Sequence, residues 1–158
     1  MDSHWVAWAA GIVDGEGAVT LSYNRSSAHK PSGQITLGVR VQMSDEAAVR
    51  RLALIFGGSV RRYAPPKTAW RLQFIWGVYS QRAYDTLKAM RPWLVTKGAL
   101  ADLGFEFWET CAKPVGWNTQ RPSGRAARLT EVERARRLDL WRRFGTLQIK
   151  GQSLRKQA

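Results

Sequence analysis

The segment 5–18 constrains the fold of this chain more than any other segment. It begins with nine apolar or small residues, WVAWAAGIV, and then changes to the sequence DGEG at residues 14–17. The apolar part has helical periodicity, and glycine commonly follows the end of a helix, so we expect a helix that Gly15 and Gly17 terminate. The alternating segment that follows predicts a strand. The two carboxylates, Asp14 and Glu16, therefore lie at a helix-to-strand junction.

One face of this helix carries almost no side chain. The residues of this small face are spaced at i, i+3, i+4 and i+7: Ala7, Ala10, Gly11 and Asp14. Such a face allows another backbone to approach unusually closely. The bulky apolar residues of the same helix are expected to fill a core on its other side: Trp5, Trp8 and Ile12.

The position of the two acids is unusual for a helix. Asp14 and Glu16 fall at its C-terminus, where the helix dipole disfavours an anion by about 0.3–1 kcal/mol. A divalent cation that neutralises the carboxylates would explain this placement. The alternative is an ordinary Asp-Gly turn that leads into a strand.

Residues 9–17, AAGIVDGEG, resemble the signature of the LAGLIDADG homing endonucleases. The motif occurs once, which resembles the single-motif class of about this length that works as a homodimer. The resemblance implies one α+β domain over 1–158 with the αββαββα fold, a curved antiparallel sheet that forms a DNA-binding saddle, and C-terminal helices. It also implies a dimer interface formed by the small helix face: Ala7, Ala10, Gly11 and Asp14.

Composition points to the same kind of partner. The chain has 25 basic and 12 acidic residues, a formal net charge of +13, which most often indicates nucleic acid. The single cysteine, Cys111, cannot form an internal disulfide, and no His/Cys spacing suggests zinc. No signal peptide and no apolar run of membrane length are found, so we expect no membrane partner and a reducing intracellular compartment: bacterial or phage cytoplasm, or an organelle.

The rest of the chain reads as an α+β domain. Alternation predicts strands at 18–25, 34–43, 60–63 and 70–76, and helical spacing predicts helices at about 44–56, 80–90 and 97–111. A capping box at 130–133 opens a last helix, and we expect a basic, mobile tail at 147–158. The long loop 113–127 is expected to be functional. The arginines of the last helix form either a solvated face or a phosphate contact: Arg134, Arg136, Arg137, Arg142 and Arg143.

The solvent face of the predicted strands is rich in hydrogen-bonding side chains and lacks acids. Gln and Arg are the side chains that pair bidentately with adenine and guanine in the major groove. We expect the following residues to contact DNA: Ser22, Asn24, Gln34, Thr36, Arg40, Gln42, Arg61, Tyr63, Arg71 and Gln73.

The resemblance also assigns a catalytic site. Glu16, with the carbonyl of Gly15, would hold a divalent metal, and hard oxygen ligands favour Mg²⁺, with Mn²⁺ or Ca²⁺ as substitutes in crystals. The stretch 91–97 resembles the family segment that delivers a lysine, here Lys97, to stabilise charge on the phosphate. A glutamine that orders water is usual at the end of the second strand. Met43 stands there with Gln42 beside it, so Gln42 is the candidate. No small-molecule cofactor is expected.

The predicted function is a site-specific homing endonuclease. As a homodimer it would make a metal-dependent, staggered double-strand break in a long pseudo-palindromic DNA target. The alternative is a non-cleaving relative of the same fold, either an intron splicing cofactor or a transcription regulator. A basic RNA-binding module of ribosomal type would explain the charge but not the acids at the helix end. A dinucleotide site at Gly11, Gly15 and Gly17 is excluded because the spacing is wrong and the preceding segment is helical.

Overall fold

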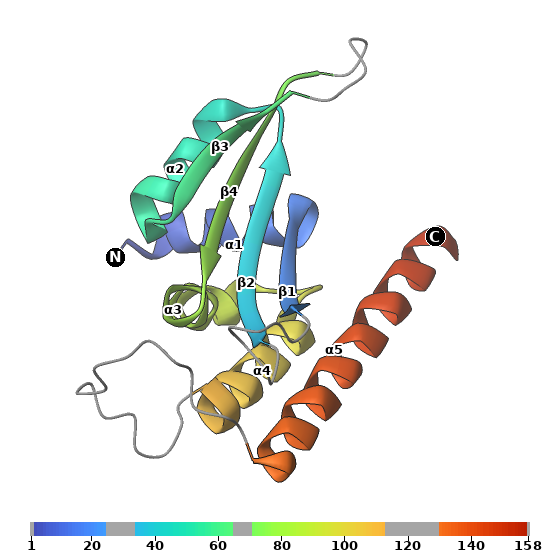
Figure 1. Ribbon diagram of the computed structural model, residues 1–158. Helices are drawn as coiled ribbons and strands as arrows, with labels where there is room; N and C mark the ends of the chain where they lie inside the picture. The colour runs from blue at the N-terminus through green and yellow to red at the C-terminus, as the bar shows by residue number, and fades with distance from the viewer. Residues whose placement is uncertain (1, 25–33, 65–70, 113–129, 158) are drawn as a thin grey trace, which may run out of the picture.

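The computed structural model describes residues 2–24, 34–64, 71–112 and 130–157. The predicted loop at 113–127 lies outside these residues. The element order begins with helix, strand, strand, helix, strand, strand, helix, which confirms the predicted α+β fold (Figure 1). The elements are α1 (Ser3–Glu16), β1 (Gly17–Asn24), β2 (Gln34–Met43), α2 (Glu46–Phe56), β3 (Ser59–Tyr63), β4 (Gln73–Tyr79), α3 (Gln81–Met90), the 3-10 turn η1 (Arg91–Trp93), α4 (Gly98–Phe107), the π-helical turn η2 (Trp108–Ala112) and α5 (Glu131–Gln157).

The four strands form one antiparallel sheet in the order β1-β2-β4-β3. The helices cover one face of this sheet, with α1 crossing behind it in Figure 1. On the covered face the ring of Trp76 packs at 6.3 Å from that of Phe56 in α2. The other face has no helix over it among the described residues. The strand that was predicted at 70–76 is β4, which begins and ends three residues later.

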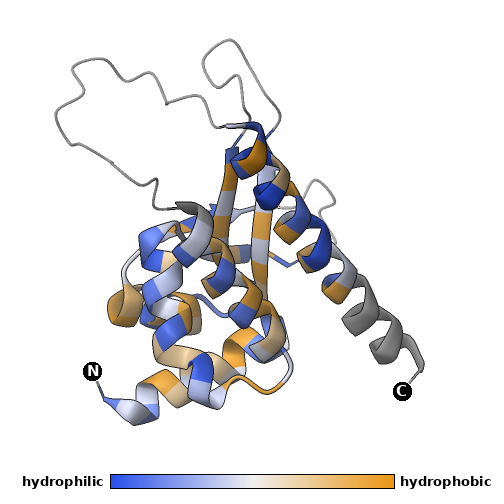
Figure 2. Ribbon diagram, turned by 90° about the horizontal axis from the view of Figure 1, so that it is seen from below, coloured by the Kyte–Doolittle hydropathy of each residue, from blue (hydrophilic) through white to orange (hydrophobic). Residues whose placement is uncertain are grey.

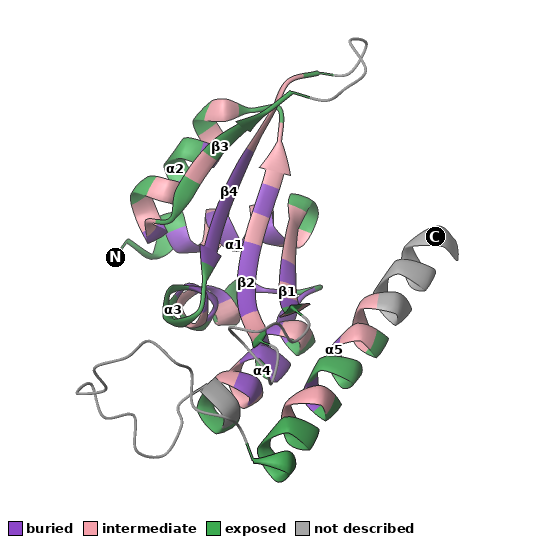
Figure 3. Cartoon of the chain, viewed as in Figure 1, coloured by how far each residue is buried: buried purple, intermediate pink, exposed green. Residues whose placement is uncertain are grey.

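Alternation along β2 separates the two faces, as the sequence predicted. The odd-numbered residues Leu37, Val39 and Val41 are fully buried towards the helices. Arg40 and Gln42 point to the open face and are half-buried. Figure 3 shows the buried residues gathered in the middle of β2 and β4. The hydrophobic effect therefore fixes the register, because a slip of one residue would exchange the two faces.

The prediction of which residues of α1 meet the core was wrong for Trp5 and was confirmed only in part for Trp8 and Ile12, which pack against the core without being fully buried. The fully or almost fully buried residues are Val6, Ala9, Ala10 and Val13. Ala10 has no exposed surface within a single chain and therefore cannot form a dimer interface. Trp5 is 42% exposed, and Trp8 and Ile12 are only partly buried. The stripe that begins at Val6 has the same helical spacing as the stripe that begins at Ala7, and its two β-branched valines fill the core better.

The junction between α1 and β1 depends on Gly17. A Cβ atom at this residue would lie 2.7 Å from both the Cα and the carbonyl oxygen of Val13. The backbone of Gly17 is extended, with φ −90° and ψ 170°, so a side chain is excluded by contact and not by backbone conformation. The helix runs through Gly15 and ends at Glu16, one residue before this close approach.

Helix α5 joins the core through Leu140 and Phe144, both 2% exposed. The predicted capping box opens it, because the Thr130 amide donates to the Glu133 carboxylate at 2.9 Å and the Glu133 amide donates to the Thr130 hydroxyl at 3.2 Å. In the part of α5 that Figure 2 colours, hydrophilic and hydrophobic residues are interspersed. It continues to Gln157, past the start of the predicted tail at 147. Among the described residues, no helix is long and apolar enough to span a membrane.

Candidate functional site

The carboxylate of Asp14 is bound within its own chain by the segment that precedes α4. One carboxylate oxygen accepts the backbone N–H groups of Val95 and Thr96, at 2.6 and 3.2 Å. The other accepts the backbone N–H of Lys97 and the hydroxyl of Thr96, both at 3.0 Å. Asp14 therefore ties the end of α1 to the residues that lead into α4. This is a structural role within one chain, and the placement of Asp14 at a dimer interface stays a prediction.

These hydrogen bonds also explain the charge of Asp14. Burial alone would raise the pKa of its carboxyl group. The backbone amides of Val95, Thr96 and Lys97 outweigh this effect, because each donates to the ionised form, and the pKa is held below its usual range. Asp14 therefore needs no metal ion to be stable as an anion at the C-terminus of α1.

Lys97 supplies the positive charge that the last turn of α1 lacks. Its ammonium group donates to the backbone carbonyl of Asp14 at 2.5 Å, and the residue is only 8% exposed. No basic residue lies in the last turn of α1 itself. A cation at the C-terminal end of a helix is favourable because that end of the helix dipole is negative. Lys97 is thereby fixed at the carbonyl of Asp14, which is two residues before Glu16 in the chain.

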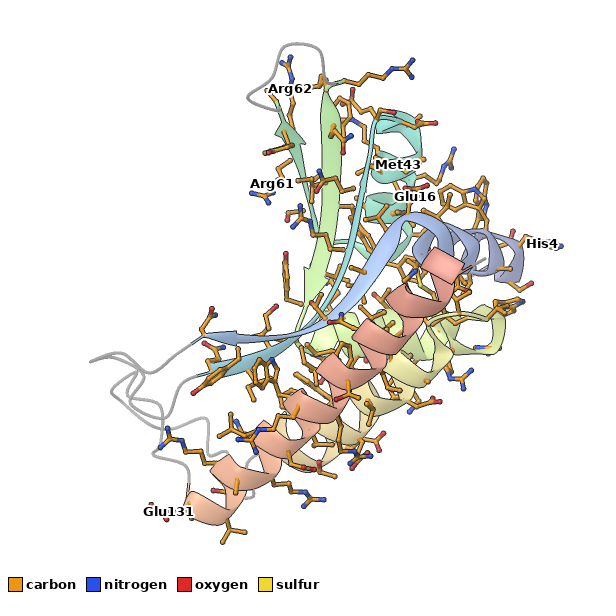
Figure 4. All side chains as sticks on the ribbon, turned by 90° about the vertical axis from the view of Figure 1, so that its right-hand side faces the viewer. His4, Glu16, Met43, Arg61, Arg62 and Glu131 are labelled. Carbon is orange, nitrogen blue, oxygen red and sulfur yellow. The ribbon has the colours of Figure 1, made fainter. Side chains whose placement is uncertain are left out.

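Glu16 differs from Asp14 in having no partner among the residues that the structure describes. It is the last residue of α1 and is exposed, and within the described part of the chain its carboxylate makes no hydrogen bond or ion pair. Glu16 lies near Met43, at the end of β2 (Figure 4). It is followed by Gly17, which pairs with Val41 of β2.

The same end of β2 carries a connected polar group on the open face. Arg40 donates to the side-chain oxygen of Gln42, and the amide nitrogen of Gln42 donates to the side-chain oxygen of Gln73 at 3.0 Å. Gln42 is thus held by side chains from β2 and β4. Met43 is on the other face and packs partly buried against the core. Gln42, and not Met43, is the residue of this pair that faces the open side.

Three or more His, Cys, Asp or Glu side chains do not come together anywhere in the described residues. A divalent metal at Glu16 would therefore take most of its ligands from backbone carbonyls, water, substrate or a second chain. Such oxygen-rich, partly external coordination suits Mg²⁺, which usually keeps several waters and binds through one or two carboxylates plus phosphate oxygens.

The open face of the sheet carries no acidic side chain. None of the four strands contains Asp or Glu, so all 12 acidic residues of the chain lie outside them. The register places nine of the ten residues predicted to contact DNA on this face, and Arg61 projects from it away from the helices in Figure 4. These nine are Ser22, Asn24, Gln34, Thr36, Arg40, Gln42, Arg61, Tyr63 and Gln73. Arg71 is exposed and precedes β4.

Comparison with known proteins identifies the fold. No protein-family model and no curated protein matches the chain in sequence. Among solved structures, the homing endonuclease I-CvuI in complex with its target in the presence of Ca aligns with a TM-score of 0.70 and 20% identity, over 92% of this chain and 82% of that one. The archaeal intron-encoded homing endonuclease I-Vdi141I complexed with DNA aligns at 0.68 and 10% identity, over 93% and 86%. The homing endonuclease I-TnaI aligns at 0.59 and 17% identity, over 96% and 98%.

The chain has the LAGLIDADG homing endonuclease fold. The alignments cover nearly all of it, so the resemblance that nine residues suggested extends to the whole domain. Helix α1 carries most of the nine residues that resemble the signature motif. Its exposed stripe contains Gly11 and Gly15, where an added Cβ would meet no atom within 4 Å.

The predicted DNA contacts omitted three polar residues of the open face: Thr20, Ser59 and Tyr79. Tyr79 is 55% exposed at the end of β4, and Thr20 lies on β1 opposite Gly38 of β2. Tyr79 was missed because the strand was expected to end at residue 76. The signal was present, since Tyr79 continues the alternation that starts at Gln73.

Proposed function

We propose that the protein is a metal-dependent DNA endonuclease that acts as a homodimer and makes a staggered double-strand break in a pseudo-palindromic target. The observation that carries this proposal is the contrast between the two acids of the motif. Asp14 is fully engaged by its own chain, whereas Glu16, two residues later, presents its carboxylate beside an acid-free sheet face. A carboxylate at the unfavourable end of a helix, with no partner in the described part of the chain, fits a metal ligand.

The open face supports double-stranded DNA as the substrate. Apart from Ala18 and the buried Ile75, its described side chains are basic or neutral hydrogen-bonding groups, and all acids of the chain lie outside the strands. This separation of charge would let a polyanion approach the sheet without repulsion, and the net charge of +13 would strengthen its attraction. The solved structures with this fold include proteins bound to DNA targets, which supports the same substrate for this chain.

Glu16, Lys97 and Gln42 would have different roles at the scissile phosphate. Glu16, with the Gly15 carbonyl, would hold Mg²⁺, which when bound polarises the phosphate and lowers the pKa of a coordinated water. Lys97, fixed at the carbonyl of Asp14, would place a positive charge close to the phosphate as negative charge develops there. Gln42 would orient water or a phosphate oxygen through its side-chain amide, which Arg40 and Gln73 hold in place.

A homodimer would arise through the exposed stripe of α1. Gly11 and Gly15 are one helical turn apart and offer bare backbone, and the partly buried Trp8 and Ile12 flank them with apolar surface. Ala7, half-buried, remains a candidate for this interface, whereas Ala10 does not. Two copies packed through this stripe would bring two Glu16 residues close together, one for each DNA strand. The isologous contact implies a pseudo-palindromic target.

Cleavage of the uninterrupted insertion locus of the encoding gene tests the proposal. With Mg²⁺, the wild type is expected to cut both strands and leave staggered ends, and without divalent metal it is expected to bind but not cut. Glu16→Gln should bind the same duplex and fail to cut. Glu131→Gln is the matched control, because Glu131 is an exposed acid at the far end of α5 (Figure 4), and this variant should cut normally.

A second candidate function is a non-cleaving DNA- or RNA-binding relative. The observation that favours it is Met43, which stands at the end of β2 and packs against the core, where it cannot order water. Specific binding by the wild type with no nicking at any Mg²⁺ concentration would support this alternative against the nuclease.

A further inference from the structure

The middle of the open face contains two glycines on neighbouring strands. Gly38 of β2 pairs with Tyr79 of β4, and Gly77 of β4 pairs with Arg40 of β2. Both glycines belong to the open face, so at these two places the sheet presents backbone where the adjoining positions present polar side chains. The surface over Gly38, between Thr36 and Arg40 on β2, can therefore be covered by a side chain from a neighbouring strand.

The ring of Tyr79 occupies this space. A Cβ atom on Gly38 would lie 3.0 Å from Cδ1 and 3.2 Å from Cε1 of the tyrosine. A Cβ atom on Gly77 would lie 3.0 Å from its hydroxyl oxygen and 3.4 Å from Cε2 and Cζ. One ring therefore lies across both glycines. Thr20 closes its β1 side, since its hydroxyl oxygen would be 3.1 Å from the same Cβ on Gly38.

The tyrosine remains accessible although it rests on the sheet. It is 55% exposed, in contrast to Ile75 on the same face of β4, which is 4% exposed. Thr20 beside it is polar, and one group of polar side chains further along the same face, Arg40, Gln42 and Gln73, is joined by hydrogen bonds. Tyr79 thus forms an isolated apolar surface in the centre of a hydrogen-bonding face. Among the described residues of this face, Tyr63 is the other aromatic, and it lies on β3 towards the tip of the β3–β4 hairpin.

We propose that Tyr79 is a specificity-determining residue that contacts the C5-methyl group of a thymine in the target. This inference rests on the proposed function as a DNA-binding nuclease. In the major groove only thymine presents a methyl group, and apolar contact is how proteins read it. A ring that lies flat on the sheet offers carbon atoms to the groove. Its neighbours offer hydrogen bonds, which distinguish the other base edges.

The test begins with selection of binding sites from a library of duplex DNA with a randomised central segment. The wild type is expected to enrich a two-fold-related sequence with thymine required at one symmetric pair of positions. Replacement of thymine by deoxyuridine at this pair removes only the methyl group. It should weaken binding about fourfold per half-site, which corresponds to one buried methyl group.

Three variants separate the ring from its hydroxyl group and from the rest of the face. Tyr79→Phe keeps the ring and should retain both the thymine preference and the loss on deoxyuridine replacement. Tyr79→Ala should bind the thymine and deoxyuridine duplexes equally. Tyr63→Ala is the matched control: it removes another exposed tyrosine of the same face, so it should lower overall affinity for DNA but leave the loss on deoxyuridine replacement at this pair unchanged. Thermal unfolding of each variant checks that the fold is intact.

The outcomes distinguish this inference from the proposed function. If the wild type selects a sequence but loses no affinity on deoxyuridine replacement at any position, the role of Tyr79 is overturned and the DNA-binding function stands. If Tyr79→Phe loses the preference as Tyr79→Ala does, the hydroxyl group makes the contact and the methyl-reading role is likewise overturned. If the wild type enriches no sequence, both the inference and the proposed function fail.

Discussion

Replacement of Asp14 by asparagine tests how α1 is joined to the segment before α4. In the wild type, two carboxylate oxygens accept four hydrogen bonds, two each, from Val95, Thr96 and Lys97. An asparagine keeps one oxygen and turns an N–H₂ group towards two of the donors. One pair of hydrogen bonds is therefore lost and replaced by donors that face each other.

The loss in free energy of unfolding depends on which of the unpaired N–H groups water can reach. The N–H groups of Val95 and Thr96 are exposed and can be solvated, whereas that of Lys97 is partly buried. Hydrogen bonds to a charged acceptor contribute about 1.5–3 kcal/mol, and an exposed donor recovers most of this from water. We expect Asp14→Asn to lower the free energy of unfolding by about 1–2 kcal/mol, and the melting temperature by roughly 3–6 °C for a domain of this size.

Urea denaturation of Asp14→Asn and of Glu16→Gln provides the assay. Glu16 makes no hydrogen bond within the described residues, so its replacement should change the free energy of unfolding by no more than about 0.5 kcal/mol. The two variants have the same change of charge at neighbouring positions. Equal stability of the two variants would refute the structural assignment of Asp14.

The pH dependence gives an independent check. The pKa of Asp14 is lowered in the folded chain, so its contribution to stability is complete above the ordinary carboxyl value of 3.8 and is lost as pH falls through the lowered value. The wild type should therefore lose more stability than Asp14→Asn on acidification below this value. The pKa of Asp102 is also lowered, by hydrogen bonding to Arg91, but it titrates in both proteins and cancels in the comparison. Parallel curves for the two proteins would contradict the prediction.

Three further substitutions test the packing of the domain. Gly17→Ala should destabilise the chain by roughly 3 kcal/mol or more, because the new Cβ meets the backbone of Val13 at 2.7 Å. Urea denaturation measures this loss, and a change below about 1 kcal/mol would contradict the prediction. In Gly11→Ala the added Cβ meets no atom within 4 Å, so the variant should stabilise the single chain by about 0.5–1 kcal/mol. The same Cβ should weaken the proposed dimer in sedimentation measurements, and an unchanged dimer would exclude Gly11 from the interface. Phe144→Ala should lower the free energy of unfolding by about 3–5 kcal/mol if α5 is part of the core. Replacement of the exposed Arg142 by alanine should lower it by about 0.5 kcal/mol or less, and similar losses for the two variants would show that α5 contributes little to stability.

The order of elements followed from the sequence because hydrophobic periodicity is local. The alternation in β2 and the capping box at Thr130 each depend on residues within a few positions of one another. The sequence also determined the charge of the domain and the chemistry available at its motif. The acids at the end of α1, the glycine that follows each of them and the acid-free strands all stand in the sequence itself.

The tertiary structure decided which of these groups have partners. Two stripes of α1 share the same helical spacing, and only the packing of the rest of the domain against this helix buries Val6 and Val13 and leaves Gly11 exposed. Asp14 and Glu16 look equivalent in sequence. The amide of Lys97, however, donates to Asp14 and not to Glu16, and it lies 83 residues further along the chain than Asp14. A contact at this separation depends on how the whole chain folds, and local pattern cannot encode it.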